Sequence, residues 1–505
     1  MRPASVVALK LVRLCWCALA CLPACGALAL AADPAQPRRP NIVYILADDL
    51  GYGDVRCLNP QSKVPTPNLD RLAAQGLTFT DAHSASAVCT PTRYGILTGR
   101  YCWRTRLKSG VLGGFSPPLI EEGRLTVPAL LRANGYDTAA VGKWHLGLDW
   151  PAASGTNFGD QIEPTGEIKR IDYTQPIRHG PMSVGFDSYF GIAASLDMPP
   201  YIFIQNDRTL GIPTATKKWI REGPAHPDFE AVDVLPRLTE AAVNYLYERA
   251  RDPAKKPFFL YLALTSPHTP VVPRSDFKGR SQAGDYGDFV AETDWALGEV
   301  QTALRQANLE QDTLLIFTSD NGYSPGGLSH ADAQKYGHQG SHIFRGTKAD
   351  IWEGGHRIPF FARWPGRTRP GSTNSETLCL NSLLATCADL LSVKLPDHAG
   401  EDSFSIAPLL RGEKPNRPTH EAVVHHSIRG MFALRQGPWK FIDGTGSGGW
   451  TKGGMEADAP PGQLYHLAED PSETRNLYRE HPEIVKRLRD LLQKFKTSGR
   501  SAPRR

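Results

Sequence analysis

Four apolar segments of this 505-residue chain each lead directly into residues that can do chemistry. Carboxylates and amides hold hard cations, lysines neutralise anions, and imidazoles move protons near neutral pH. If the apolar segments are strands of one α/β sheet, their carboxyl ends meet at the edge where such folds bind ligands. The residues concerned are Asp48 and Asp49, Lys143 and His145, His268, and Asp320 and Asn321.

The residues after the first and last of these segments offer only oxygen donors. Asp48, Asp49 and Asp320 are carboxylates, and Asn321 is an amide. Such a set favours Ca²⁺ or Mg²⁺ over zinc, and crowded carboxylates repel one another unless a cation neutralises them. Either pair alone is explained as well by strand-end turns. Both pairs at one sheet edge favour a metal site.

The segment Cys89-Thr90-Pro91-Thr92-Arg93 begins a predicted helix that ends at Gly99. Pro91 suits the first turn, and Gly99 suits the C-terminal cap. The helix N-terminus would favour an anion beside Cys89, with Arg93 one turn further on to orient it. The plainer alternatives are a buried structural cysteine and a surface arginine.

Two lysines and two histidines complete the candidate set. Lys143 and His145 are predicted on one extended segment, so both point to the same side while Trp144 packs inward. Prolines at positions 267 and 270 fix the direction of His268, and Lys348 follows a glycine-containing turn. Together with Arg93, the lysines could neutralise an anion, although each residue alone is more often structural or solvent-exposed.

The ordered set of motifs resembles the type I, formylglycine-dependent sulfatases, an arylsulfatase-like branch of the alkaline phosphatase superfamily. In that family, a Cys-x-Pro-x-Arg segment is read by the formylglycine-generating enzyme, which converts the cysteine to formylglycine (3-oxoalanine). Thr92 stands where the family more often has serine. The motifs in chain order are Asp48-Asp49, Cys89 to Arg93, Gly142 to Gly147, Ser266-Pro267-His268, Ser319 to Gly322, Arg345 to Lys348 and Trp352 to Gly355.

The resemblance implies a mechanism and a ligand set. Ca²⁺, with Mg²⁺ as the alternative, would be bound by Asp48, Asp49, Cys89 as its modified oxygen, Asp320 and Asn321. A hydrated aldehyde at residue 89 would attack sulfur, assisted by Arg93 and Lys143. His268 with Lys348 would protonate the leaving alcohol, and His145 would remove the proton that releases sulfate. Sulfate binding is assigned to Ser195, Lys143, His268 and Lys348.

The expected fold is α/β: a large, mostly parallel or mixed β-sheet flanked by helices, with a small C-terminal domain of antiparallel sheet and one helix. The predicted division is 33–414 and 415–505. Strands are expected at 41–47, 138–141, 257–264, 313–317 and 358–364, and helices at 68–75, 233–249, 288–306 and 482–495. A hairpin is expected at 430–441, turning at Gln436-Gly437, and Asn68 is expected to cap its helix.

Residues 1–32 have the basic start, apolar stretch and small-residue end of a signal peptide. Lipoprotein processing at Cys25 is the weaker alternative. Removing three basic and no acidic residues lowers the net charge from +5 to +2, which gives no case for nucleic acid or stable membrane insertion. The chain has no Asn-x-Ser/Thr site, so a bacterial periplasmic or secreted enzyme is expected.

The remaining cysteines and the substrate stay open. Besides Cys89, the exported chain keeps Cys57, Cys102, Cys379 and Cys387, which could form disulfides or be buried hydrophobes. A sulfated carbohydrate or other small sulfated molecule is the expected substrate, with 151–183, His330, His338 and His342 shaping a sugar subsite. The competing functions are a phosphatase or phosphonate monoester hydrolase, and an inactive sulfatase-like binding protein; the oligomeric state is not predicted.

Overall fold

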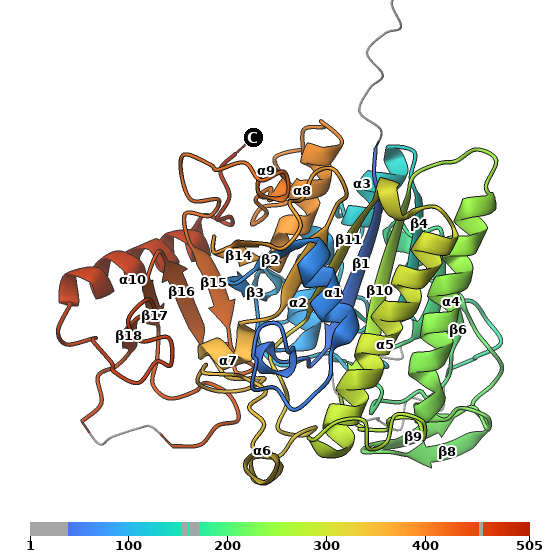
Figure 1. Cartoon of the computed structure of the whole chain (residues 1–505), viewed down its shortest axis with the longest axis horizontal. Helices are drawn as coiled ribbons and strands as arrows, with labels where there is room; N and C mark the ends of the chain where they lie inside the picture. The colour runs from blue at the N-terminus through green and yellow to red at the C-terminus, as the bar shows by residue number, and fades with distance from the viewer. Residues whose placement is uncertain (1–38, 153–158, 161–170, 454–457, 505) are drawn as a thin grey trace, which may run out of the picture. The chain divides into compact units, whose positions relative to one another are not determined.

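A mixed ten-stranded sheet forms the centre of the described part of the chain. The computed structural model describes residues 39–152, 159–160, 171–453 and 458–504. The predicted signal peptide, the Cys25 alternative and much of 151–183 lie outside these ranges. The strand order is β13-β2-β12-β11-β1-β10-β4-β5-β6-β7. Figure 1 shows the sheet with helices in front of and behind it.

Five neighbouring strands in the middle of the sheet run parallel. They are β11 (Thr313–Ser319), β1 (Asn41–Asp48), β10 (Phe258–Pro267), β4 (Asp137–Lys143) and β5 (Ser188–Ile192). On the β11 side, the sheet continues with the antiparallel partner β12 (Phe360–Arg363) and then β2 (Leu77–Phe79) and β13 (Ser372–Asn374). On the β5 side, it continues with the antiparallel strands β6 (Ile204–Gln205) and β7 (Arg208–Thr209). The expected fold class is confirmed, as are all five predicted strands.

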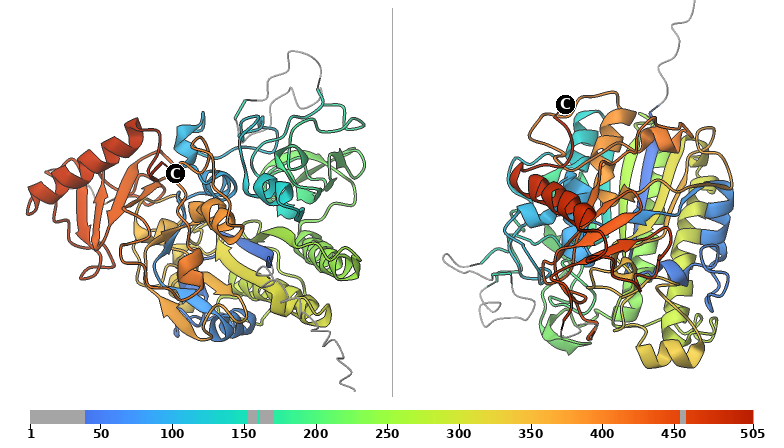
Figure 2. Two further views of the ribbon diagram at one scale, coloured as in Figure 1. Left: turned by 90° about the horizontal axis from the view of Figure 1, so that it is seen from above. Right: turned by 90° about the vertical axis from the view of Figure 1, so that its left-hand side faces the viewer.

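Both faces of the central sheet are buried, which explains why its strands are apolar at nearly every position. Ile42 and Tyr44 of β1 pack in one core with α2 (Cys89–Thr98), α3 (Val127–Ala133) and α8 (Leu383–Leu390). Val43 and Ile45 pack in the other core with α1 (Pro67–Gln75), α4 (Ala231–Arg251) and α5 (Gly284–Gln306). Figure 2 shows these helix layers on opposite sides of the sheet.

The predicted cap of helix α1 is wrong. The residue before the helix is Thr66, and Pro67 occupies its first turn. The backbone N–H of Asn68 donates to both carboxylate oxygens of Asp294 at 3.1 Å, and its side-chain amide donates to Oδ2 at 2.8 Å. Asn68 therefore fixes α1 to α5 instead of capping its own helix.

A second sheet and one helix end the chain. β15 (Val423–His426), β16 (Phe432–Gln436), β17 (Trp439–Ile442) and β18 (Gln463–His466) are antiparallel and share a core with α10 (Pro482–Thr497). Gln436 pairs with Trp439, so the hairpin turns at Gly437-Pro438, one residue later than predicted. The antiparallel sheet and its helix are confirmed, whereas the boundary at residue 415 stays a prediction. The remaining elements are β3 (Ala82–His83), β8 (Ala215–Lys218), β9 (Glu222–Ala225), β14 (Leu378–Cys379), α6 (His330–Tyr336), α7 (Glu353–His356) and α9 (Ala407–Leu410).

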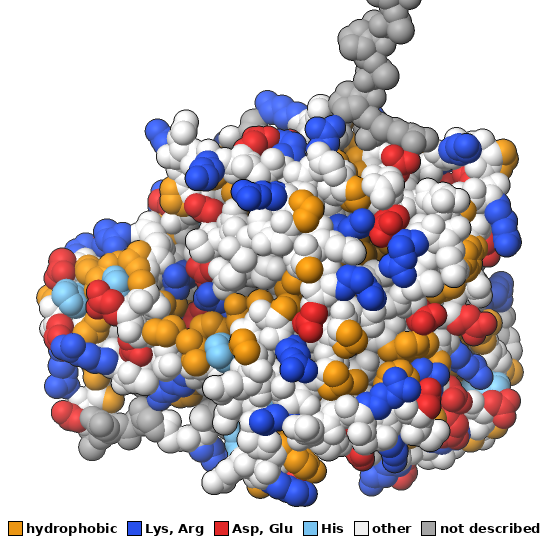
Figure 3. Space-filling view, in the orientation of Figure 1, with side chains coloured by type: hydrophobic (Ala, Val, Ile, Leu, Met, Phe, Trp, Pro, Cys, Tyr) orange, Lys and Arg blue, Asp and Glu red, His pale blue; other side chains and the backbone are white. Residues whose placement is uncertain are grey.

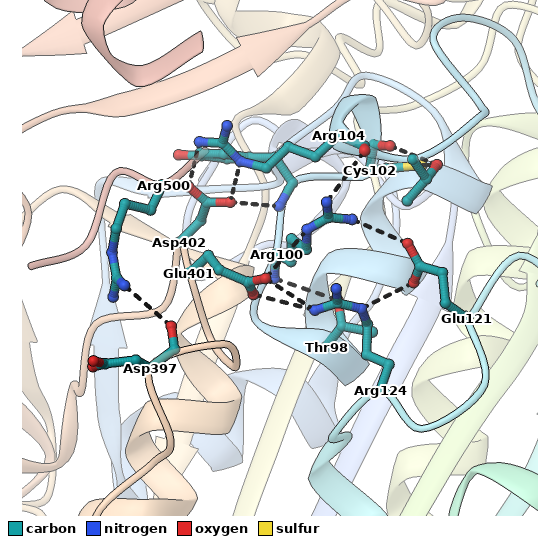
Figure 4. A network of polar contacts seen from close by, with 12 residues as sticks. Thr98, Arg100, Cys102, Arg104, Glu121, Arg124, Asp397, Glu401, Asp402 and Arg500 are labelled. Atoms are coloured by element: carbon teal, nitrogen blue, oxygen red, sulfur yellow. Dashed lines mark hydrogen bonds and ion pairs between the residues drawn. The ribbon is translucent and has the colours of Figure 1, made fainter. Parts of the chain in front are cut away.

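A polar network ties the end of the chain to the segment after α2 (Figure 4). Arg104 donates to both carboxylate oxygens of Asp402 at 2.8 Å. Asp402 also accepts from the backbone of Tyr101 and Ser501, so one carboxylate joins three chain segments. The network holds the helix that starts at Cys89 in place from its far end.

A buried polar joint connects the C-terminal sheet to α7 and to β3, which forms a two-stranded sheet with β14. His83 Nε2 lies 2.7 Å from Asp81 Oδ1, and His83 Nδ1 lies 3.0 Å from His356 Nδ1. Lys440 Nζ lies 3.1 Å from His356 Nε2, and the His356 and His425 rings stack at 3.9 Å. Since these residues come from β3 and the residues just before it, α7, β15 and β17, the joint depends on the C-terminal sheet packing against β3 and α7.

All five cysteines after the predicted leader are free thiols in the described structure. Cys57 is exposed, and the other four are buried. The disulfide alternative is therefore not realised here, and Cys102, Cys379 and Cys387 act as small core residues. Among the described residues, no helix is long and apolar enough to cross a membrane.

Candidate active site

The carboxyl ends of the parallel strands deliver the predicted residues to one buried region. Asp48 is the last residue of β1, Lys143 is the last residue of β4, and Asp320 directly follows β11. His268 directly follows β10. Cys89 is the first residue of α2, as predicted, and Gly99 ends that helix with φ 65°. These side chains are almost fully buried, His268 being the most exposed at 7%.

Three carboxylates are each paired with a basic side chain. Lys143 Nζ lies 2.7 Å from Asp48 Oδ2, and Lys348 Nζ lies 2.7 Å from Asp49 Oδ1. Arg93 donates to Asp320 Oδ2 from Nε at 3.0 Å and from Nη2 at 2.8 Å.

Burial and these partners act in opposite directions on the charged groups. Burial raises the pKa of Asp48, but Lys143, His268 and Arg93 outweigh it and hold the pKa below its usual value. Burial lowers the pKa of Lys348, but the Asp49 carboxylate outweighs it and raises that pKa. The region is therefore charged, and its charges balance within the protein.

The oxygen donors suit a hard cation. Asp48, Asp49, Cys89 and His268 bring ligand atoms within 4.8 Å of one another, and all four are buried. Asn321 Nδ2 donates to Asp49 Oδ1 at 2.7 Å. Asp48 Oδ1 and Asn321 Oδ1 accept no hydrogen bond from any described residue. Buried acceptors without donors are costly, and a cation would satisfy both. The structure thus contains a buried acidic site that fits a divalent metal.

The Cys89 thiol is a poor nucleophile in this environment. Burial raises its pKa to about 12; Lys143 and Lys348 oppose this, while Asp320 and Asp48 reinforce it. At neutral pH the side chain is therefore the neutral thiol, because the thiolate is the minor form five units below the pKa.

His145 lies in a different backbone conformation from the one predicted. It has φ 57°, in the left-handed region, so the extended segment ends at Lys143. Its Nε2 lies 2.7 Å from the Leu112 carbonyl oxygen, while its buried Nδ1 has no hydrogen-bond partner among the described residues. Burial, reinforced by Lys143 and Arg93, lowers its pKa well below the usual value. Trp144 packs into the core, as predicted.

His268 has a fixed orientation. Its Nδ1 lies 2.6 Å from the Thr269 carbonyl oxygen, so Nδ1 carries a proton and Nε2 faces Asp49 Oδ2 at 3.7 Å. Ser195 follows β5, is buried, and its Oγ has no hydrogen-bond partner in the described part of the chain. Its loop meets the His145 segment, since the His145 N–H donates to the Ala193 carbonyl oxygen at 3.0 Å.

One neighbour of the site was not predicted. Asp197 Oδ1 lies 3.9 Å from His268 Nδ1, and Asp197 also pairs with Arg221. It stands two residues after Ser195, in a turn where the Met198 N–H donates to the Ser195 carbonyl oxygen at 2.9 Å. Its neighbours carry no distinctive motif, and sequence spacing alone gave no reason to choose it.

The proposed role of His338 in a sugar subsite is wrong. His338 is fully buried; its Nε2 lies 2.8 Å from Asp54 Oδ1, and its Nδ1 accepts from the Lys63 N–H at 3.2 Å. Both ring nitrogens are thus used inside the fold. His330 begins α6 and is exposed, and His342 stacks on Tyr52. Among the described residues, neither forms a hydrogen bond or ion pair with the buried site, so their subsite role stays a prediction.

Comparison with known proteins identifies the family. The sulfatase family model matches residues 40–393, which span the central sheet and every candidate residue named above. The chain belongs to the sulfatase family. It is accordingly an enzyme that hydrolyses sulfate esters, and the resemblance in the ordered motifs is confirmed.

Its relatives match over most of their length. An N-acetylgalactosamine-6-O-sulfatase from Bacteroides thetaiotaomicron is 33% identical, covering 91% of this chain and 94% of the relative. Human arylsulfatase A is 34% identical, covering 92% and 89%. A solved sulfatase structure, from work on metabolism of multiple glycosaminoglycans by Bacteroides thetaiotaomicron, has a TM-score of 0.78 and 31% identity, covering 91% of this chain and all of that one.

Proposed function

We propose that this sulfatase removes sulfate from a sulfated carbohydrate, with formylglycine made from Cys89 as its nucleophile. The observation that carries the proposal is the position of Cys89: it begins a helix, within a cluster of buried cations, at the carboxyl ends of the parallel strands. A helix N-terminus and these cations favour a bound sulfate at that point. The formylglycine-generating enzyme would be the maturation partner.

The chemistry at residue 89 depends on two added components. Hydrated formylglycine supplies a hydroxyl nucleophile, and a divalent cation supplies positive charge beside it. Asp48, Asp49, Asp320 and Asn321 would hold that cation, together with the oxygen on residue 89. Their donors are all oxygen, which favours Ca²⁺, with Mg²⁺ as the alternative.

The protein's own cations bind and polarise the sulfate group. Lys143, Lys348 and Arg93 now neutralise the three carboxylates one by one. A cation held by those carboxylates would leave the lysines' charge available to the sulfate oxygens. Ser195 Oγ, buried and without a partner among the described residues, adds a hydroxyl donor. Preorganised donors of this kind stabilise charge that develops in the transition state.

The two histidines divide the proton transfers. His145 donates from Nε2 to the Leu112 carbonyl oxygen, so Nδ1 is the unprotonated nitrogen and can accept a proton. His268 holds its Nδ1 proton against the Thr269 carbonyl oxygen, so Nε2 is the atom that faces the site, with Lys348 nearby through Asp49. With both ring nitrogens protonated, Nε2 would deliver its proton to the departing alcohol and leave the neutral ring. The backbone carbonyls thus fix which nitrogen of each histidine faces the reaction.

The substrate is proposed from the relatives and the predicted export. One relative is named for the 6-O-sulfate of N-acetylgalactosamine, and a similar solved structure comes from work on glycosaminoglycans. We therefore propose an exported bacterial enzyme, periplasmic or secreted, that acts on 6-sulfated N-acetylgalactosamine in such glycans. Aryl sulfates would serve as model substrates.

The test is co-production with a formylglycine-generating enzyme, followed by mass analysis of the peptide that contains residue 89. Activity is then compared on N-acetylgalactosamine 6-sulfate, an aryl sulfate and the matching aryl phosphate. We expect conversion of Cys89 and faster hydrolysis of both sulfates. Full activity with an intact thiol would refute the nucleophile, and preference for the phosphate would favour a phosphatase. Conversion without any turnover would favour a binding protein.

A further inference from the structure

A groove of about 1330 Å³ lies between the C-terminal sheet and the main body, and none of the described residues that line it belongs to the candidate active site. One wall is formed by segments 375–377 and 417–423. The other is formed by the β16–β17 turn and by α10. The buried residues Asp81, His420 and Arg435 form its deepest part. The groove is therefore separate from the sulfate site.

The described lining of the groove is basic. Three acidic residues line it, and one of them, Asp81, is already bound to Arg357 at 2.5 Å and Arg435 at 3.4 Å. Six basic residues line it: Arg417, Arg435, Arg487, Lys494, Arg500 and Arg504. Figure 3 shows both basic and acidic side chains on the face that it draws. In the described lining of the groove, basic residues outnumber acidic ones.

The groove also offers flat apolar surface. Trp439 is half-buried beside the exposed Pro438 at the β16–β17 turn. The Trp439 ring is held edge-on against His466 and lies 5.3 Å from the His481 ring. A fixed aromatic ring next to arginine suits a ligand that has apolar ring faces and anionic substituents.

We propose that this groove binds a second stretch of the sulfated glycan chain whose sulfate esters the active site hydrolyses. The inference rests on the proposed substrate class. A sulfated chain carries negative charge along its length and presents sugar rings for stacking, so it complements both features of the lining. Binding away from the active site would hold the enzyme on a polymer between successive reactions, and would have no effect on a single sulfated sugar.

The test uses the full mature enzyme with a charge-reversed groove, Arg417→Glu/Lys494→Glu. Both residues are exposed, so the fold should tolerate the change. We expect KM for chondroitin 6-sulfate chains to rise about tenfold, because two attractive contacts become repulsive, while kcat and KM for N-acetylgalactosamine 6-sulfate stay unchanged. Arg251→Glu/Lys256→Glu, exposed charges at and after the end of α4, is the matched control and should leave both substrates unaffected.

Binding is measured separately from turnover. Cys89→Ala protein, with and without the groove change, is titrated with chondroitin 6-sulfate, unsulfated chondroitin and polyglutamate at low and high salt. Salt-sensitive binding of the sulfated chain that the groove change abolishes supports the proposal, even if the wild type hydrolyses neither substrate and the proposed function falls. Equal loss on polymer and single sugar, no loss on either, or tighter binding of polyglutamate would each overturn the proposal.

Discussion

The active site and the joint at the C-terminal sheet are both buried clusters of opposite charges, yet only one of them is placed for catalysis. Both bring potential metal ligands within 4.8 Å: Asp48, Asp49, Cys89 and His268 in the first, and His83, His356 and His425 in the second. Composition therefore does not separate them. The active site lies at the carboxyl ends of parallel strands and beside a helix N-terminus, whereas the joint lies where the C-terminal sheet meets β3 and α7.

The hydrogen-bond directions also differ. In the joint, His83 donates from Nε2 to Asp81, so its Nδ1 accepts from His356 Nδ1, and His356 Nε2 accepts from Lys440. This chain from Lys440 to Asp81 uses every ring nitrogen of His83 and His356 without a metal. The described acceptors without a hydrogen-bond donor include two oxygens in the active site, Asp48 Oδ1 and Asn321 Oδ1, whereas in the joint they are His425 Nε2 and Glu473 Oε1, the latter 2.8 Å from Lys440 Nζ. Unsatisfied oxygens mark the region that fits a cation.

The largest effect is expected from Cys89→Ser. Serine has one hydroxyl and no aldehyde form, so the route that releases sulfate is closed, and turnover should fall more than about 10⁴-fold, as for other nucleophile losses. Cys102→Ser is the matched control, since Cys102 is also buried and free, and lies within reach of the Thr105 hydroxyl and the Leu107 carbonyl. Steady-state turnover rates of both variants on an aryl sulfate test this prediction. Comparable losses of turnover in the two variants would contradict it.

The next largest effect is expected from metal removal, which should affect the active site and not the joint. Chelation is expected to lower activity by about 10²-fold or more, because fixed charge beside the reacting group is lost, and Ca²⁺ should restore it. Bound cation also stabilises the folded state by mass action, so thermal unfolding should shift upward with added Ca²⁺. Asp320→Asn should abolish that shift, whereas His356→Gln should leave it intact. A metal-free enzyme with full activity would remove the metal from the mechanism.

The positions of the active-site residues could be predicted from sequence, but most of their partners could not. Asp48 and Asp320 end apolar runs, and Cys89 precedes a proline and a glycine at helix spacing, so local patterns were sufficient. Lys143 pairs with Asp48 only because β10 lies between β4 and β1, an order that no local pattern encodes.

The joint and the groove lay beyond sequence reasoning for the same reason. Each is assembled from segments hundreds of residues apart, such as Asp81 and Arg435, whose neighbours show no motif. Where a local rule failed, tertiary contacts had overridden it: Asn68 binds Asp294 on another helix, and His145 adopts a left-handed backbone that the alternation rule does not anticipate.

A stability test distinguishes the joint from the active site. Lys440 lies 3.0 Å from Glu353 and 2.8 Å from Glu473, all fully buried. Lys440→Met leaves two buried carboxylates without this partner and should cost about 3–5 kcal/mol in the free energy of unfolding. The exposed Lys452→Met is the control and should change it by less than about 0.5 kcal/mol. Lys143→Met should instead lose activity. Urea unfolding at neutral pH measures the difference. If the free energy of unfolding of Lys440→Met equals that of the wild type, the joint does not stabilise the fold.

The smallest expected effect is a change in how stability depends on pH. Burial lowers the pKa of His83 below the usual 6.5 and holds the pKa values of His356 and His425 well below it. It lowers the pKa values of His420 and His426 to about 4. Unfolding then takes up a proton at each one, so their contribution to stability is complete above pH 6.5 and is lost as the pH falls towards 4. Glu473 acts in the opposite sense, because burial raises its pKa to about 7 and its contribution is lost as the pH rises through that value.

The histidines outnumber that single glutamate, so the free energy of unfolding should fall with decreasing pH between about 6.5 and 4. His420→Gln should reduce the slope by about 1.4 kcal/mol per pH unit, the value of one proton. His330→Gln removes an exposed histidine and should leave the slope unchanged. Urea unfolding at a series of pH values gives both slopes. If the slope is equal in wild type and His420→Gln, that histidine is not held neutral by the fold, and the pH sensitivity comes from other groups.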